Sequence, residues 1–221
     1  MSNISVAFDL DDTLYKEIDF VRSGYCFIDR KLSEFGFCRQ EEACRILWEA
    51  YTVGKNPFLS LNQALNIDLP IDIYLRWYRF HVPDISLDEI TDKVLVWLLR
   101  NGVKMGLISD GRSITQRNKI HALGLDKYIN DNIIISEEVG SEKPSSANYE
   151  MFSKSCKPNS RFVYVGDNPS KDFITPNRLG WITIGLKDDG RNIHKQVGYN
   201  SSSNPTYWIS NIDEIVKLLH K

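Results

Sequence analysis

The chain has 221 residues, of which 27 are lysine or arginine and 29 are aspartate or glutamate, so its formal net charge is −2. This length allows one domain with an insertion, and it allows a core that needs no disulfide or metal support. No segment is dense enough in lysine and arginine to predict a nucleic-acid or anionic-membrane surface, so we expect small-molecule or protein partners.

The distribution of apolar residues and cysteines excludes further classes of protein. The longest apolar run near a candidate helix, residues 94–99, is far shorter than the roughly 20 residues of a membrane span. The N-terminus lacks the basic region of a secretory signal, and the four cysteines form no C-x-x-C pair, which favours reduced thiols. No cysteine opens a Cys-x5-Arg loop, so a cysteine-based phosphatase is excluded. We therefore expect a soluble cytoplasmic protein that contacts neither membrane nor nucleic acid.

The first predicted element is a buried strand, ISVAF at residues 4–8, which three carboxylates follow closely. Asp9 and Asp11 lie two residues apart and therefore project to the same side of an extended chain, whereas Leu10 projects away. The next strand signal comes only at residue 103, and a block this long exceeds an ordinary connection between a strand and a helix. Helical spacing of apolar residues instead predicts helices at 16–36, 40–53, 59–66, 71–80 and 87–101.

Strand signals recur later in the chain and alternate with helical ones. Apolar runs predict strands at 103–109, 132–136, 162–166 and 181–185, and helices at 113–123, 145–155 and 170–179 separate them. Such alternation is typical of a parallel sheet with helices on both faces. The sequence thus predicts an α/β protein with a Rossmann-like core at 1–15 and 87–221, and an all-helical cap at 16–86 inserted after the first strand.

Polar residues follow each of four predicted strands. They are Asp9, Asp11, Asp12 and Thr13 after the first strand, Ser109, Asp110 and Gly111 after the second, Lys143 after the third, and Asp167 and Asp172 after the fourth. Because ligands of an open parallel sheet bind outside the carboxyl ends of its strands, we expect these side chains to meet at one edge. Carboxylates crowded there need a cation, and hard oxygen ligands favour Mg2+.

Four motifs in this order resemble those of the haloacid dehalogenase superfamily. They are D-x-D-x-T at residues 9–13, Ser109, Lys143 followed by Pro144, and G-D-x4-D at residues 166–172. The helical block at 16–86 is similar to the C1 type of cap in that family. The chain looks most like the branch that includes N-acylneuraminate-9-phosphatases, pyrimidine nucleotidases and phosphoglycolate phosphatases.

The resemblance implies a Mg2+-dependent phosphatase that acts on a small phosphorylated metabolite, sugar-phosphate or nucleotide-like, through an aspartyl-phosphate. Asp9 is the implied nucleophile. Asp11 is the implied general acid and then base, and we expect burial and an anionic neighbour to raise its pKa. Ser109 and Lys143 are implied to bind the phosphoryl group. The implied metal ligands are Asp9, the carbonyl of Asp11 and Asp167.

Further residues are implied to support these groups. The hydroxyl of Thr13 is expected to hold Asp11 or its loop, and Asp172 to orient Lys143 or a metal-bound water rather than bind the metal. Asp110 is expected to face the leaving group and to favour a neutral or sugar-like one, and Gly111 to let the backbone approach the ligand. The candidates for substrate contact from the cap are Lys16, Arg22, Lys55 and Asn56, with Arg76 and Arg79 beside them.

Plainer interpretations of single residues stay open at this point. Ser109 could cap the helix that follows it, Lys143 could be a solvated lysine before a helix, and Asp172 could be an acid favoured by a helix dipole. The four histidines match no ligand spacing and are expected to be packing or surface groups.

Two other functions compete with the phosphatase hypothesis. A hexose-phosphate phosphomutase would depend on a bisphosphate activator and would keep the phosphate on its product. A non-catalytic phosphometabolite-binding protein would have no use for a nucleophile and an acid at the spacing of Asp9 and Asp11. A dehalogenase is disfavoured because it needs no acid at the position of Asp11.

Overall fold

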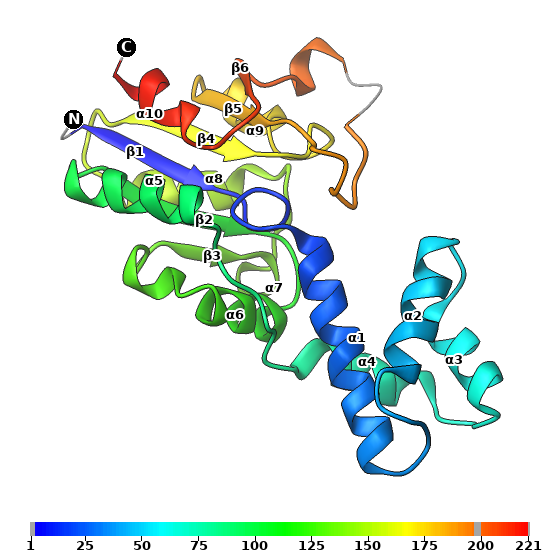
Figure 1. Cartoon of the computed structure of the whole chain (residues 1–221). Helices are drawn as coiled ribbons and strands as arrows, with labels where there is room; N and C mark the ends of the chain where they lie inside the picture. The colour runs from blue at the N-terminus through cyan, green and yellow to red at the C-terminus, as the bar shows by residue number, and fades with distance from the viewer. Residues whose placement is uncertain (1–2, 197–199, 221) are drawn as a thin grey trace.

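The structure, a computed structural model, describes residues 3–196 and 200–220. Its centre is a six-stranded sheet with the order β3-β2-β1-β4-β5-β6, in which every pair of neighbours is parallel (Figure 1). This confirms the predicted α/β class. The strands are β1 (Ile4–Phe8), β2 (Lys104–Ser109), β3 (Ile133–Ile135), β4 (Arg161–Gly166), β5 (Ile182–Leu186) and β6 (Tyr207–Ile209).

Helices cover both faces of the sheet, so the central strands are apolar on both sides. Val6 and Phe8 of β1 face one apolar layer, and Ala7 between them faces the other; all three are completely buried. The first layer takes side chains from α5 (Glu89–Arg100), α6 (Ser113–Ala122) and α10 (Glu214–Leu219). The second takes side chains from α8 (Ser146–Lys154), and α9 (Ile174–Arg178) packs beside it.

The block between β1 and α5 is helical, as predicted. Its helices are α1 (Glu17–Glu34), α2 (Glu42–Thr52), α3 (Pro57–Leu65) and α4 (Ile71–Phe80). They extend away from the sheet (Figure 1) and pack around a separate cluster of buried side chains that includes Leu47, Leu61 and Tyr74. The C-terminal end of α4 rests on α6, where the Asn118 side chain donates a hydrogen bond of 3.0 Å to the His81 carbonyl. The division at residues 16 and 86 stays a prediction that this separate cluster supports.

The C-terminal part of the chain differs most from the sequence prediction. The sequence does not predict strand β6 or helix α10, because segments of three and six residues are too short to establish an apolar period. The helix predicted over 170–179 begins only at Ile174, since Asn168 and Asp172 form a turn in which the Asp172 amide donates to the Asn168 carbonyl at 2.9 Å. None of the helices within residues 3–196 and 200–220 is long and apolar enough to cross a membrane.

His81 is a packing group at the junction between α4 and the core, as the sequence indicated. It is 2% exposed, and its ring centroid lies 5.0 Å from that of Phe20 and 5.7 Å from that of Phe27. One ring nitrogen lies 2.7 Å from the Tyr78 carbonyl, and the other lies 3.2 Å from the Ser23 hydroxyl. Burial lowers the pKa of His81; the Tyr78 carbonyl partly offsets this effect, and nearby positive charges add to it.

We expect His81 to contribute a loss of stability as the pH falls below about 6.5, the ordinary pKa of histidine. Below that pH the unfolded chain binds a proton at His81 that the folded protein takes up only at lower pH, so acid favours unfolding. The loss has an upper limit of about 1.4 kcal/mol per pH unit for one proton. Urea unfolding of the wild type and of His81→Gln at pH 7.5 and 5.5 checks this, because the variant should lose less stability, or gain more, than the wild type between these two pH values. An equal change in unfolding free energy for both proteins would contradict the role of His81.

Candidate active site

The candidate site lies where the order of the strands reverses direction. From β1 the chain continues to β2 and β3 on one side of β1, and it then crosses to β4 on the other side. Such a switch point leaves a crevice beyond the carboxyl ends of the strands, which is where ligands bind in this architecture. Asp9 lies there directly after β1, its amide donating to the Val165 carbonyl of β4 at 2.8 Å, and Asp167 follows β4.

A buried lysine joins two of the predicted site carboxylates. The ammonium group of Lys143 donates hydrogen bonds of 2.6 Å to Asp9, 2.8 Å to Asp172 and 3.2 Å to the Tyr164 hydroxyl. The side chains of Lys143 and Asp172 are fully inaccessible to solvent, and that of Asp9 is 6% exposed. Burial alone would lower the pKa of Lys143, but the charges of Asp172 and Asp9 raise it, so the lysine is charged. The interpretation of Lys143 as a solvated residue is therefore wrong.

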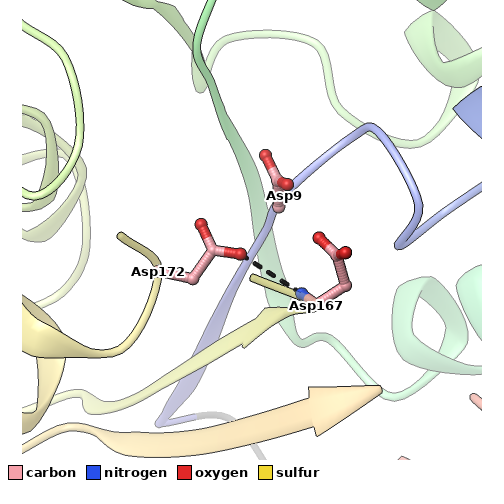
Figure 2. Close-up of side chains that lie close together, drawn as sticks. All are labelled: Asp9, Asp167 and Asp172. Atoms are coloured by element: carbon pink, nitrogen blue, oxygen red, sulfur yellow. Dashed lines mark hydrogen bonds between the residues drawn. The ribbon is translucent and has the colours of Figure 1, made fainter. Parts of the chain in front are cut away.

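Asp172 is bound on both of its oxygens by groups of the protein. Oδ1 accepts from Lys143, and Oδ2 accepts from the backbone amides of Asp167, at 3.2 Å, and Asn168, at 2.9 Å. Figure 2 shows the bond to the Asp167 amide, with the carboxylates of Asp9 and Asp167 close by. Gly166 makes this arrangement possible, because a Cβ atom there would lie 2.5 Å from Oδ2. These contacts support the prediction that Asp172 orients Lys143 and does not bind a metal.

Asp11 lines the same cleft as Asp9 and is held by three side chains. Oδ1 accepts from the Tyr15 hydroxyl at 2.5 Å and from Lys119 at 2.7 Å, and Oδ2 accepts from Gln116 at 3.0 Å. Burial raises the pKa of Asp11, but the charge of Lys119 and these hydrogen bonds outweigh it and hold the pKa below its usual value. The expectation of a raised pKa is therefore wrong. The buried Thr13 hydroxyl, expected to hold Asp11, has no hydrogen-bond partner among the described residues.

Ser109 is tied to Asp11 through Gln116. The amide nitrogen of Gln116 donates to the Ser109 hydroxyl at 2.7 Å and to the Asp11 carboxylate, and this leaves the Ser109 proton available for a ligand. Ser109 ends β2, whereas α6 begins four residues later with Arg112 as its N-cap residue. Ser109 is therefore not a helix cap.

Asp12 and Asp110 hold the loops around the site. Asp12 accepts from the Glu17 amide at 3.0 Å and from the Ile193 amide at 2.9 Å, so it ties the start of α1 to the loop after β5. Asp110 accepts from the Lys143 amide at 3.0 Å and pairs with Lys171 at 3.3 Å. Since both oxygens of Asp110 have partners, its observed role is to hold the Lys143 loop.

Gly111, the other supporting glycine, has a φ of +133°, which an L side chain rarely adopts. Its amide donates to the Ser136 hydroxyl at 2.9 Å, so it turns the chain after β2 toward the start of α7 (Ser136–Val139). A glycine at this position lets the loop after β2 bend directly beside the site.

The carboxylates of Asp9 and Asp167 fit a hard divalent cation. Oxygens of Asp9, Asp167 and Asp172 lie within 4.8 Å of one another. Burial raises the pKa of Asp9 to about 6 although Lys143 opposes the shift, and burial with the charges of Asp172 and Asp9 raises the pKa of Asp167 to about 9. Ionised carboxylates so placed need a cation, and buried hard oxygen donors are the ligands that Mg2+ prefers. The residues present therefore fit the predicted magnesium.

Comparison with known proteins identifies the family. A family model described as haloacid dehalogenase-like hydrolase matches residues 5–180. The chain belongs to this family. It is therefore an enzyme, a hydrolase, as the ordered motifs indicated.

Relatives of this haloacid dehalogenase-like hydrolase support the predicted branch. A glyceraldehyde 3-phosphate phosphatase of Methanocaldococcus jannaschii is 31% identical over 194 residues, covering 82% of this chain and 83% of that protein. An N-acylneuraminate-9-phosphatase of Rattus norvegicus is 30% identical over 163 residues, covering 71% of this chain and 61% of that protein. The magnesium-bound structure of the HAD-hydrolase YfnB from Bacillus subtilis covers all of both chains with a TM-score of 0.65 and 18% identity, a likeness of fold.

The cap candidates of this hydrolase do not line the cleft around Asp9. Lys16 contacts Asn192 at 2.7 Å and pairs with Asp189 at 3.2 Å, while Arg22 lies over the ring of Trp48. Asn56 caps α3, and Lys55 is exposed beside it. Arg76 and Arg79 line a different cleft, together with Arg112.

Sequence reasoning missed several residues that surround the site. Lys119 and Gln116 lie one turn apart on the buried face of α6, and a lysine on an otherwise buried helix face was the available signal. The loop after β5 was assigned no role, yet Asn192 donates to the Asp167 carboxylate at 2.9 Å and Gln196 to the Asp167 carbonyl at 2.6 Å. His194 of the same loop lines the cleft, and no local pattern distinguished it from a surface histidine.

Proposed function

We propose that this hydrolase is a Mg2+-dependent phosphatase that acts on a small phosphorylated metabolite. The observation that carries the proposal is the buried ammonium group of Lys143, which bridges Asp9 and Asp172 at the switch point of the sheet. Phosphatase names among the relatives support the same reaction. The cleft that Asp9 and Asp11 line has a volume of about 190 Å³, which suits a small phosphate ester.

In the first half-reaction, an oxygen of the Asp9 carboxylate attacks phosphorus and forms an aspartyl-phosphate. The bond between phosphorus and the ester oxygen breaks, and the leaving oxygen takes a proton from Asp11. Because Lys119 stabilises the ionised form of Asp11, the contact between these two groups must loosen when substrate binds.

In the second half-reaction, Asp11 accepts a proton from a water molecule whose oxygen attacks the phosphorus of the aspartyl-phosphate. The bond to Asp9 breaks, inorganic phosphate leaves, and the Asp9 carboxylate is restored. The ionised form of Asp11 that Lys119, Tyr15 and Gln116 stabilise suits this base role.

Fixed positive charge and hydrogen-bond donors stabilise the charge that develops on the phosphoryl oxygens. Lys143 supplies a positive charge that Asp172 holds in place, and Ser109 supplies a hydroxyl donor. Bound Mg2+, held by Asp9 and Asp167 with the Asp11 carbonyl as a further predicted ligand, would neutralise part of the charge on the phosphate.

Removal of divalent metal is expected to lower the rate of p-nitrophenyl phosphate hydrolysis by at least about a hundredfold. The measurement compares metal-free enzyme in EDTA with the same enzyme after addition of excess Mg2+. Calcium serves as a control for charge alone, because it prefers more ligands and longer bonds than Mg2+. Hydrolysis that is equally fast in EDTA would contradict the proposal, and Mg2+-dependent binding of phosphate esters without turnover would favour the non-catalytic alternative.

A further inference from the structure

The cleft that contains Asp9 is strongly acidic. Nine described residues line it, and six of them are carboxylates: Asp9, Asp11, Asp12, Glu17, Asp110 and Asp167. The other three are Asn168, Lys171 and His194. Asp9, Asp11 and Asp167 have roles in the proposed reaction. Asp12 and Asp110 accept hydrogen bonds from backbone amides and so hold the surrounding loops. Among these six carboxylates, the side chain of Glu17 alone has no role in the proposed reaction and accepts no hydrogen bond that fixes a loop.

Glu17 is placed beside the position of the leaving group. It is the first residue of α1, where the chain passes from the sheet to the helical block, and its backbone is fixed by Asp12. Its carboxylate lies 3.9 Å from the ammonium group of Lys119, which lies 2.7 Å from Asp11. Because Asp11 is proposed to protonate the leaving oxygen, the atoms next to that oxygen lie close to Glu17. No described residue donates a hydrogen bond to the Glu17 carboxylate, which is 26% exposed. Burial and the charge of Asp11 raise the pKa of Glu17 to about 8 although Lys119 opposes the shift, so Glu17 carries its charge in mildly alkaline solution.

The lysines around the cleft are already paired with carboxylates. Lys143 contacts Asp9 and Asp172, Lys171 pairs with Asp110 at 3.3 Å, and Lys119 pairs with Asp11 at 2.7 Å. Lys119 also lies 3.9 Å from the Glu17 carboxylate, and only 4% of its side chain is exposed. When the contact between Lys119 and Asp11 loosens, Lys119 keeps Glu17 as a carboxylate partner, so a second anionic group on a substrate would meet no lysine free to receive it.

We propose that Glu17 selects substrates whose leaving group carries hydroxyl or amine groups and no second anionic group, an inference that rests on the proposed phosphatase function. A carboxylate accepts hydrogen bonds from hydroxyl and ammonium groups, and it repels a second carboxylate or phosphate. The leaving group of glyceraldehyde 3-phosphate is uncharged, whereas that of N-acylneuraminate 9-phosphate carries a carboxylate. We therefore expect substrates with an uncharged leaving group, such as glyceraldehyde 3-phosphate, to be hydrolysed faster than substrates whose leaving group carries a carboxylate.

A matched pair of substrates tests the inference. Glyceraldehyde 3-phosphate and 3-phosphoglycerate share a carbon frame and differ in whether the far end is an aldehyde or a carboxylate. At pH 9, where Glu17 is ionised, we expect kcat/KM of the wild-type enzyme with Mg2+ to be at least about tenfold higher for the aldehyde. Glu17→Gln should reduce that ratio by about tenfold, mainly by lowering KM for 3-phosphoglycerate, because glutamine keeps the size and removes the charge.

Asp19→Asn is the matched control for loss of one charge near the start of α1. Asp19 is half-exposed, does not line the cleft and lies 3.9 Å from Arg22, so the substrate ratio should stay at the wild-type value. A wild-type enzyme that hydrolyses both substrates equally well, or a ratio that Glu17→Gln leaves unchanged, overturns the role of Glu17. If these results come with Mg2+-dependent hydrolysis of p-nitrophenyl phosphate that Asp9→Asn abolishes, the phosphatase proposal survives. If no phosphate ester is hydrolysed, both proposals fail.

Discussion

Replacing Asp9 by asparagine is expected to lower kcat for p-nitrophenyl phosphate by at least about a thousandfold, because the neutral amide is a far poorer nucleophile toward phosphorus than the carboxylate. Stopping the wild-type reaction in acid should trap a phosphoryl group on the peptide that contains Asp9, and mass spectrometry should find none on the variant. The loss should appear in kcat, since the chemistry fails although phosphate esters still reach the cleft.

The fold of the Asp9→Asn protein provides the control. Burial raises the pKa of Asp9 to about 6, so at pH 7.5 the metal-free folded state holds a buried charge that it disfavours, and the amide removes that charge. The variant also loses the charge partner of Lys143, but Asp172 remains. We therefore expect a metal-free Tm no lower than about 5 °C below that of the wild type. Retention of a tenth or more of the wild-type rate in a folded variant would remove Asp9 from the mechanism.

Replacing Lys143 by methionine is expected to damage stability and activity together. The methionine leaves Asp9 and Asp172 buried beside each other without a cation, and removal of one partner from a buried ion pair costs about 3–5 kcal/mol of unfolding free energy. The rate should fall by at least about a hundredfold, because the phosphoryl oxygens lose a fixed positive charge. Urea unfolding and kcat of the metal-loaded enzyme measure the two effects.

A second variant separates these two effects. Lys143→Met combined with Asp172→Asn removes one of the unpaired buried charges, so it should regain part of the lost stability while the rate stays low. Lys93→Met, which breaks an exposed pair with Glu89, should change neither quantity much. A stable and active Lys143→Met protein would show that the lysine is not needed in the cleft. Recovery of activity in the double variant would assign Lys143 a structural role alone.

The relation between Lys143 and Asp172 could be anticipated, whereas the surroundings of Asp11 could not. The spacing of the motifs at strand ends predicts that Asp9, Lys143 and Asp167 approach one another, since parallel strands present their carboxyl ends at one edge. The direction of the Asp11 side chain depends instead on Lys119, which is 108 residues away in the sequence. No local pattern contains that contact.

The sequence by itself determined the α/β class, the position of the helical insertion and the set of carboxylates at the sheet edge. These features follow from apolar periodicity and from the polar residues after each strand, both of which are local properties of the chain. Only the tertiary structure decided which charges neutralise one another, that Asp110 holds the Lys143 loop, and that Glu17 is left facing the cleft. Electrostatic pairing depends on distances between side chains from different elements, and packing of helices against the sheet sets those distances.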